Sequence, residues 1–243
     1  MNQTIMITGA SKGLGKALAL GFAKKGNRLA ICARGQEELF KVKEQIEAEG
    51  AAVIAIQADA VKSEDVDRFV SVVEEQWGAI DVLINNASIF GPGPEYLLDY
   101  DVKRFEEVLR VNVMNPFIVT KRVLPGMLTR KTGSIINITS EAGHTGFAEW
   151  GAYGISKFAV EGMTQTWADE AADYNVRINM VDPGEMDTEM HDIAVPDCDY
   201  TLAKPEERLE VFYYLASEAS EYRTGERFEA ASFSGVEAGE EHE

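Results

Sequence analysis

A regular alternation of short apolar runs and longer amphipathic segments is the feature that most constrains the fold. Strands are expected where Ile, Val, Leu and Ala run almost continuously, at residues 4–8, 28–33, 52–58, 82–85, 134–139, 177–181 and 227–231. Helices are expected at residues 14–25, 36–49, 63–77, 102–129, 151–174 and 205–217. Continuously apolar strands are covered on both faces, and alternating strands and helices form right-handed crossovers. The sequence therefore predicts an α/β fold of the Rossmann type, a doubly wound parallel sheet of about seven strands with helices on both faces.

A glycine-rich turn joins the first expected strand to the first expected helix. Residues 8–15 read Thr-Gly-Ala-Ser-Lys-Gly-Leu-Gly. Glycines allow positive φ and close backbone approach, and the start of the following helix offers free N–H groups to a pyrophosphate. Any tight turn from strand to helix can use glycine, but its place after the first strand favours dinucleotide binding. The expected contacts are Gly9, Ser11, Lys12, Gly13, Leu14 and Gly15.

The end of the second expected strand bears on the choice of dinucleotide. An acidic residue there would bind the adenosine ribose hydroxyls, but this chain has Arg34. With Lys12 in the glycine turn, Arg34 can hold a 2′-phosphate through paired donors. Both cations could instead be solvated surface charges. In a chain of net charge −18, two cations at one corner favour NADP(H), with NAD(H) as the alternative.

Tyr153 and Lys157 lie four residues apart in an expected helix, and therefore on one helix face. A nearby ammonium favours phenolate, so we expect Lys157 to lower the pKa of the Tyr153 hydroxyl. A phenol tuned in this way can exchange a proton with an alcohol or a carbonyl oxygen near neutrality. Tyr and Lys at this spacing are common on amphipathic helices, where they are usually a half-buried ring and a solvated amine. The spacing alone is therefore weak evidence for catalysis.

Taken together, these motifs resemble the short-chain dehydrogenase/reductase family over residues 4–233. Besides the glycine turn, the matching positions are Asp59 after the third strand, Asn85-Asn86-Ala87 after the fourth, Asn112, Ser140 thirteen residues before Tyr153, and Pro183-Gly184 followed by Thr188. The chain departs from the family pattern at Ser88, where glycine is usual, and at Asp182, where a small apolar residue is common. Neither departure removes a catalytic group.

The resemblance implies a role for each of four catalytic residues. Tyr153 is the general acid in carbonyl reduction and the base in alcohol oxidation, and Lys157 binds the nicotinamide ribose. Ser140 donates to the substrate oxygen, and Asn112 holds a water that links Lys157 to solvent. Singly, each has an ordinary explanation as a cap, a packing residue or a surface residue. The further cofactor contacts that the resemblance implies are Asp59, Asn86, Ala87, Pro183, Gly184, Met186 and Thr188.

Three segments are expected around the substrate, at residues 89–96, 141–150 and 185–204. They are rich in aromatic and Met side chains, which favours a partly apolar carbonyl compound, although these residues could also pack loops or subunit contacts. The candidate pocket residues are Phe90, His144, Phe147, Trp150 and Met190. The histidines His144 and His191 lack a ligand spacing, so no metal is expected.

Composition excludes several classes of partner. A net charge of −18 argues against nucleic acid and anionic membranes. No signal peptide or membrane span is evident, and the two cysteines suggest a reduced compartment, so we expect a cytoplasmic protein. Residues 1–243 are expected to form one dinucleotide-binding and catalytic domain, with a small substrate-loop insert at 185–204 and a flexible acidic tail at 235–243.

The leading hypothesis is an NADPH-dependent carbonyl reductase acting on a small molecule. The alternatives are an NAD-dependent alcohol or sugar dehydrogenase, a 3-oxoacyl thioester reductase, and a non-catalytic dinucleotide sensor or scaffold. The long expected helices at 102–129 and 151–174 carry many apolar residues. By resemblance they form a four-helix interface between subunits, so we expect a homotetramer, or otherwise a dimer.

Overall fold

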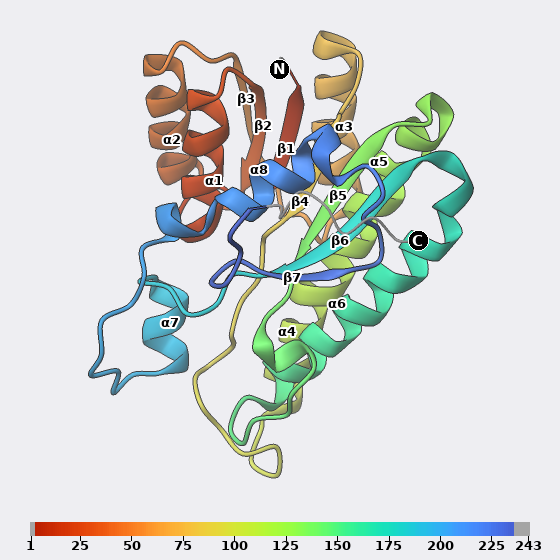
Figure 1. Ribbon diagram of the computed structural model, residues 1–243. Coiled ribbons are helices and arrows are strands. Elements are labelled where there is room, and N and C mark those ends of the chain that lie inside the picture. The colour runs from red at the N-terminus through yellow and green to blue at the C-terminus, as the bar shows by residue number, and fades with distance from the viewer. Residues whose placement is uncertain (1–2, 236–243) are drawn as a thin grey trace.

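The computed structural model describes residues 3–235 and contains one parallel sheet (Figure 1). The strand order is β3-β2-β1-β4-β5-β6-β7, so the direction of winding reverses between β1 and β4. This switch point is where open α/β sheets bind ligands. The predicted doubly wound sheet is confirmed. Its strands are β1 (Thr4–Thr8), β2 (Arg28–Ala33), β3 (Val53–Gln57), β4 (Val82–Asn85), β5 (Gly133–Ile138), β6 (Val176–Asp182) and β7 (Arg227–Glu229).

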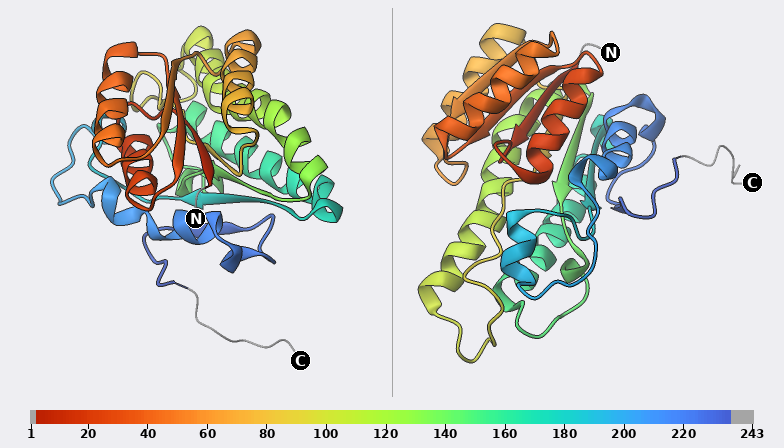
Figure 2. Two further views of the ribbon diagram at one scale, coloured as in Figure 1. Left: turned by 90° about the horizontal axis from the view of Figure 1, so that it is seen from above. Right: turned by 90° about the vertical axis from the view of Figure 1, so that its left-hand side faces the viewer.

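Helices cover both faces of the sheet, as Figure 2 shows from above. Successive residues of β1 point to opposite faces, so Ile5 and Ile7 pack in one core and Met6 in the other. The first core is closed by α1 (Gly13–Lys24), α2 (Gln36–Ala48) and α8 (Glu210–Ala216). The second is closed by α3 (Ser63–Trp77), α5 (Asn115–Arg130) and α6 (Gly151–Glu170). Together the two cores hold the carboxyl ends of the strands in fixed positions.

The single helix predicted at 102–129 is interrupted in the structure. It forms α4 (Val102–Leu109), a π-helical turn at Arg110–Met114, and then α5. π-Helical turns insert an extra residue into a helix and occur often at functional sites. Here the turn carries Asn112, whose side chain is bound by backbone outside the helix.

Three further differences from the predicted elements lie toward the C-terminus. The segment at 185–204, expected as a loop, contains the short helix α7 (Glu189–Ala194), which Thr188 caps by accepting a hydrogen bond from the His191 N–H. The helix predicted at 205–217 begins instead as a 3₁₀ turn, Pro205–Arg208, before α8. The helix predicted at 151–174 ends at Glu170 and continues only as a 3₁₀ turn.

The predicted flexible tail lies outside the described residues, apart from Gly235. Within residues 3–235, none of the helices has the length and apolar character needed to cross a bilayer.

Candidate active site

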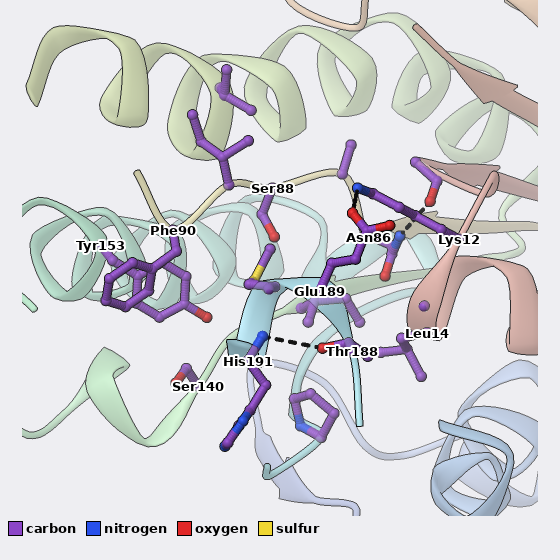
Figure 3. Close-up of a pocket in the computed structure, with 18 of the residues that line it drawn as sticks. Lys12, Leu14, Asn86, Ser88, Phe90, Ser140, Tyr153, Thr188, Glu189 and His191 are labelled. Carbon is purple, nitrogen blue, oxygen red and sulfur yellow. Dashed lines mark hydrogen bonds and ion pairs between the residues drawn. The ribbon is translucent and has the colours of Figure 1, made fainter. Parts of the chain in front are cut away.

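A cavity of about 1000 Å³ runs along the carboxyl ends of the strands, from the glycine turn to Tyr153. Figure 3 shows Lys12, Leu14 and Asn86 at one end and Phe90, Ser140 and Tyr153 at the other. The cavity brings together most of the residues predicted from the sequence. Its lining includes Gly9, Ser11, Lys12, Gly13, Leu14, Arg34, Asp59, Asn86, Ala87, Ser140, Tyr153, Lys157, Pro183, Gly184, Met186 and Thr188.

The glycine turn has a shape that other residues would not fit. Gly9 and Gly13 have φ of +68° and +52°. A Cβ on Gly9 would lie 2.8 Å from the Ala87 Cα, and one on Gly15 would lie 2.3 Å from the Gly9 carbonyl oxygen. Gly15 does not line the cavity, but it lets α1 start directly beneath the turn. The Asn86 amide donates to the Gly9 carbonyl at 3.0 Å and so fixes the turn against the end of β4.

The start of α1 offers backbone N–H groups to the cavity, because no side chain caps this helix. A helix N-terminus with free N–H groups and a positive dipole end is suited to an anionic group such as a pyrophosphate. The described residues therefore fit a dinucleotide at this end of the cavity.

The two predicted phosphate-binding cations have different surroundings. Arg34 follows β2, is exposed, lines the cavity and makes no ion pair with any residue in the described range 3–235. Lys12 forms an exposed ion pair with Glu189 at the start of α7. Arg34 is thus available to a ligand phosphate, whereas Lys12 must first leave Glu189. Asp59 lies beyond β3 on the same wall, where its carboxylate accepts the Val61 N–H at 3.4 Å.

The predicted catalytic triplet meets at the other end. Helix α6 places Tyr153 and Lys157 one turn apart, with only 8% and 2% of their surfaces exposed. The Lys157 Nζ donates to the Ile138 carbonyl at 2.8 Å and lies 5.4 Å from the centre of the Tyr153 ring. Ser140 follows β5, and its hydroxyl accepts the Ala142 N–H at 3.2 Å. The three side chains share one wall of the cavity.

The expected effect of Lys157 on Tyr153 is wrong for this structure. Burial raises the pKa of the Tyr153 hydroxyl to about 12, the Asp182 charge adds to this, and only a hydrogen bond with Ser140 lowers it. Burial likewise lowers the pKa of Lys157 to about 8, against the attraction of Asp182 and Glu161. Loss of water around the phenol outweighs the neighbouring ammonium. Tyr153 is therefore held as a neutral phenol, which is the form that donates a proton.

Asn112 lies behind the cavity and does not line it. Its side-chain oxygen accepts the Ile89 N–H at 2.8 Å, and its amide donates to the Ile89 carbonyl and to Ser156 Oγ, each at 2.9 Å. The side chain thereby fastens the loop after β4 to helix α6. The structure assigns it an anchoring role, and its predicted water-holding role stays a prediction.

An aromatic cluster forms the wall beside Tyr153. The Phe90 ring centre lies 5.1 Å from that of Trp150 and 5.2 Å from that of Tyr153, and Phe147 lies 5.8 Å from Trp150. These rings line the cavity together with Met190 from α7. They supply an apolar face beside the Tyr153 hydroxyl, of the kind that small-molecule sites commonly have.

His144 is the one predicted pocket residue that the structure places elsewhere. It follows the 3₁₀ turn at Glu141–Gly143, which directs its side chain to solvent, and its Nδ1 lies 3.0 Å from Thr145 Oγ1. The lining of the cavity leaves it out.

The sequence alone does not predict that His191, Glu185 and Tyr200 form a polar cluster near the predicted substrate end of the cavity. His191 of α7 is 7% exposed, and its Nε2 lies 3.3 Å from Glu185 Oε1, which also accepts the Tyr200 hydroxyl at 2.7 Å. The His191 Nδ1 has no partner among the described residues. The spacing of these residues matches no motif, so only the folded segment brings them together. Residues 3–235 contain no group of three or more His, Cys, Asp or Glu that could hold a metal ion.

Comparisons with known proteins point to one enzyme family. The family model for short chain dehydrogenases matches residues 3–198. The 3-oxoacyl-acyl-carrier-protein reductase FabG of Thermotoga maritima is 34% identical over 91% of this chain and 93% of its own length. A short chain dehydrogenase from Shigella flexneri, crystallised with NADP, superposes with a TM-score of 0.90 at 30% identity over 95% of this chain and 98% of that one.

A second solved structure carries the other nicotinamide cofactor. An NAD⁺-bound xylitol dehydrogenase has a TM-score of 0.86 at 28% identity and covers 93% of this chain and 96% of its own. The fold, the cavity and the matched residues define an oxidoreductase that works with a nicotinamide cofactor. The chain belongs to the short-chain dehydrogenase/reductase family.

Proposed function

We propose that the protein is an NADPH-dependent carbonyl reductase. The observation that carries this proposal is geometric: Ser140, Tyr153 and Lys157 line one end of a cavity that begins at the glycine turn, and the Lys157 Nζ lies 5.4 Å from the centre of the Tyr153 ring. A phenol held in this place next to an ammonium can donate a proton to a carbonyl oxygen as it gains negative charge.

The cofactor would supply the hydride to the carbonyl carbon. Ser140 and Tyr153 would both bind the carbonyl oxygen, so negative charge developing there is stabilised as Tyr153 gives up its proton. Lys157, held by the Ile138 carbonyl, would place its ammonium beside the phenolate that remains. The aromatic wall of Phe90 and Trp150 would exclude water from the reacting atoms.

The preference for NADPH is supported by Arg34. It stands at the end of β2, lines the cavity and has no carboxylate partner among the described residues. Arg binds phosphate through paired N–H groups, so it favours a cofactor that carries a 2′-phosphate. Among the similar solved structures, one from Escherichia coli contains NADPH and the xylitol dehydrogenase contains NAD⁺, so both cofactors occur on this fold.

A 3-oxoacyl thioester is the second candidate substrate. Relatives from Thermotoga maritima, Staphylococcus epidermidis and Synechocystis carry the name 3-oxoacyl-acyl-carrier-protein reductase at 32–35% identity. Such a substrate also presents a ketone to the proton donor, so the same residues would act on it. A thioester carried on an acyl carrier protein would require a basic docking surface near the cavity. The net charge of −18 on this chain disfavours such a basic surface.

We also propose that the protein forms a homotetramer, with a dimer as the alternative, in the cytoplasm. The support for assembly is a set of large apolar side chains exposed along the π-helical turn and α6: Met114 at 44%, Ile155 at 43% and Phe158 at 48%. Exposed apolar groups of this kind mark subunit contacts. The free cysteines Cys32 and Cys198 fit a reduced compartment.

A substrate panel tests the proposed function. The purified protein is mixed with NADPH and, separately, with aldehydes, apolar ketones, sugars and 3-oxoacyl thioesters, and cofactor oxidation is followed by its absorbance. We expect the fastest turnover with apolar ketones or aldehydes, and slower turnover when NADH replaces NADPH. No cofactor oxidation with any carbonyl would overturn the proposal, and fastest turnover with the thioesters would favour the second candidate.

A further inference from the structure

Arg227, the first residue of β7, connects four parts of the molecule behind the reaction centre. Its side chain is 18% exposed, and its guanidinium contacts three carboxylates and one carbonyl. Nε lies 3.2 Å from Glu161 Oε1, Nη1 lies 2.8 Å from Glu229 Oε1, and Nη2 lies 2.7 Å from Asp182 Oδ2 and 3.3 Å from the Ser140 carbonyl oxygen. The planar fork of Arg thereby joins the ends of β5, β6 and β7 to helix α6.

The end of β5 is held at three successive residues, the last of which is the predicted catalytic serine. The contacts are Lys157 Nζ to the Ile138 carbonyl (2.8 Å), Thr139 Oγ1 to Glu161 Oε1 (2.7 Å) and Arg227 Nη2 to the Ser140 carbonyl (3.3 Å). The following turn packs closely on the same group, since a Cβ on Gly143 would lie 2.4 Å from Glu161 Oε1. Two cations and one carboxylate therefore set the position of the Ser140 backbone.

Asp182 extends this arrangement to the end of the neighbouring strand β6. Its side chain is 12% exposed, and its Oδ1 accepts the Gly184 N–H at 2.9 Å while Oδ2 accepts from Arg227. The turn at Pro183 and Gly184 lines the cavity. Asp182 stands where the family resemblance leads us to expect a small apolar residue.

The charges of the group depend on one another. Asp182 and Glu161 are largely buried and favour the charged form of Lys157, whose burial opposes it. Buried carboxylates keep their charge only when a cation is paired with them. Removal of the guanidinium would leave both carboxylates without their main partner, and would loosen the Ser140 and Gly184 segments at the same time.

We propose that Arg227 is a positioning residue for the reaction, which holds Ser140 and the turn at Pro183 in register with Lys157 on α6. The inference rests on the proposed carbonyl reductase function, because it gives Arg227 a part in that reaction. Arg227 does not touch the reacting atoms. It acts through the Ser140 backbone and through the carboxylates of Asp182 and Glu161.

Three variants of the full-length protein test this role. Arg227→Gln removes the charge and the fork, Arg227→Lys keeps the charge, and Arg223→Gln is the matched control. Arg223 pairs with Glu226 on the surface, with 47% of its side chain exposed, and contacts none of the catalytic residues. Each variant is measured for kcat, NADPH dissociation constant and melting temperature, and for hydrogen exchange of peptides that cover residues 138–143 and 182–184.

In Arg227→Gln we expect kcat to fall at least about tenfold while the NADPH dissociation constant changes less than about threefold, because the glycine turn is untouched. Amides of the two segments should exchange faster, and Arg227→Lys should recover part of the lost kcat. Arg223→Gln should match the wild type in kcat and in exchange.

Two results would overturn the inference. One is a folded Arg227→Gln variant with wild-type kcat and wild-type exchange in both segments. The other is a parallel decrease in kcat, NADPH affinity and melting temperature in Arg227→Gln that Arg227→Lys does not reverse. That result would show that Arg227 stabilises the whole fold and does not specifically position the two segments. The hydrogen-exchange measurement does not depend on turnover. It therefore tests whether Arg227 positions these segments even if the wild type oxidises no NADPH and the proposed function is wrong.

Discussion

The predicted cofactor end of the cavity includes the backbone of the glycine turn, whereas aromatic and Met side chains line the predicted substrate end. The glycine turn presents N–H groups and bare Cα atoms, and Asn86 fixes it by bonding to backbone carbonyls. The substrate end is formed by Phe90, Trp150 and Met190, which come from three separate segments. A site formed by backbone tolerates few substitutions, because each one alters the chain's path. A site formed by side chains can change its ligand one residue at a time.

The ion pair between Lys12 and Glu189 joins the two ends. Lys12 belongs to the glycine turn and Glu189 to α7, the helix that carries Met190 and His191. Figure 3 shows the Glu189 side chain extending from α7 to Lys12. Binding of a ligand at one end is therefore expected to change the affinity for a ligand at the other end. The change should be small, because exposed ion pairs contribute little free energy.

The sharpest test of the predicted cofactor end is Gly15→Ala. The new Cβ would lie 2.3 Å from the Gly9 carbonyl oxygen and 2.5 Å from Asn86 Nδ2, so the turn must move. We expect NADPH affinity to fall at least about a hundredfold, measured by fluorescence titration. Gly162→Ala is the matched control, since this glycine of α6 has open space around it and should bind NADPH normally and melt higher. Wild-type affinity in a folded Gly15→Ala protein would contradict the comparison.

The next test concerns Arg34, the exposed cation at the end of β2 that we propose selects the cofactor. Arg34→Asp should shift the ratio of kcat/KM for NADPH over NADH toward NADH by about a hundredfold, because it removes the phosphate donor and adds an acceptor for ribose hydroxyls. Lys43→Asp is the control, because it makes the same change of charge at a partly exposed residue that pairs with Glu47 outside the cavity. An equal shift of this ratio in both variants would show that the effect comes from net charge and not from Arg34 itself.

The pH dependence of reduction tests the predicted reaction centre at the substrate end. Tyr153, with a pKa raised to about 12, remains a proton donor throughout the neutral range. Lys157 loses its proton as the pH rises through about 8, so kcat for reduction should fall on the alkaline side. Loss of the ammonium should reduce kcat about tenfold, and Lys157→Arg should remove the pH dependence because a guanidinium stays charged. A decline in wild-type kcat only on the acid side would contradict these pKa directions.

The smallest expected effect concerns the bridge between the ends. Glu189→Gln frees Lys12 for a cofactor phosphate, so NADPH should bind about threefold more tightly at low salt, with the gain lost near ~0.5 M salt. Glu47→Gln removes the same charge from an ion pair on α2 and should leave NADPH affinity unchanged. Binding that is weaker in Glu189→Gln than in Glu47→Gln would show that the ion pair supports the cofactor site.

Features set by neighbouring residues could be predicted from the sequence, whereas contacts between distant residues could not. The sheet, both helix layers and the glycine turn follow from local patterns, since hydrophobic periodicity and glycine act on neighbouring residues. The pairing of Glu185, His191 and Tyr200 and the four contacts of Arg227 do not follow, because they join residues that no local pattern relates. Helix α7 was missed because its six residues are too few for a periodic signal.

The error about Tyr153 has a related cause. Its distance from Lys157 along the helix was available from the sequence, and it predicted a lowered pKa. The degree of burial was not, and burial dominates the pKa of both groups. His144 shows the same limit, because its neighbours in the chain suggested the pocket while the 3₁₀ turn before it directs the ring to solvent.

The most direct test of the account is Tyr153→Phe, assayed in parallel for NADPH binding and for NADPH oxidation with the best carbonyl substrate of the panel. The phenylalanine ring keeps the packing against Phe90 and removes only the hydroxyl that supplies the proton. We predict a dissociation constant within about threefold of wild type and a kcat reduced at least about a thousandfold. Retention of more than a few per cent (~5%) of wild-type turnover would contradict the assignment of Tyr153 as the proton donor.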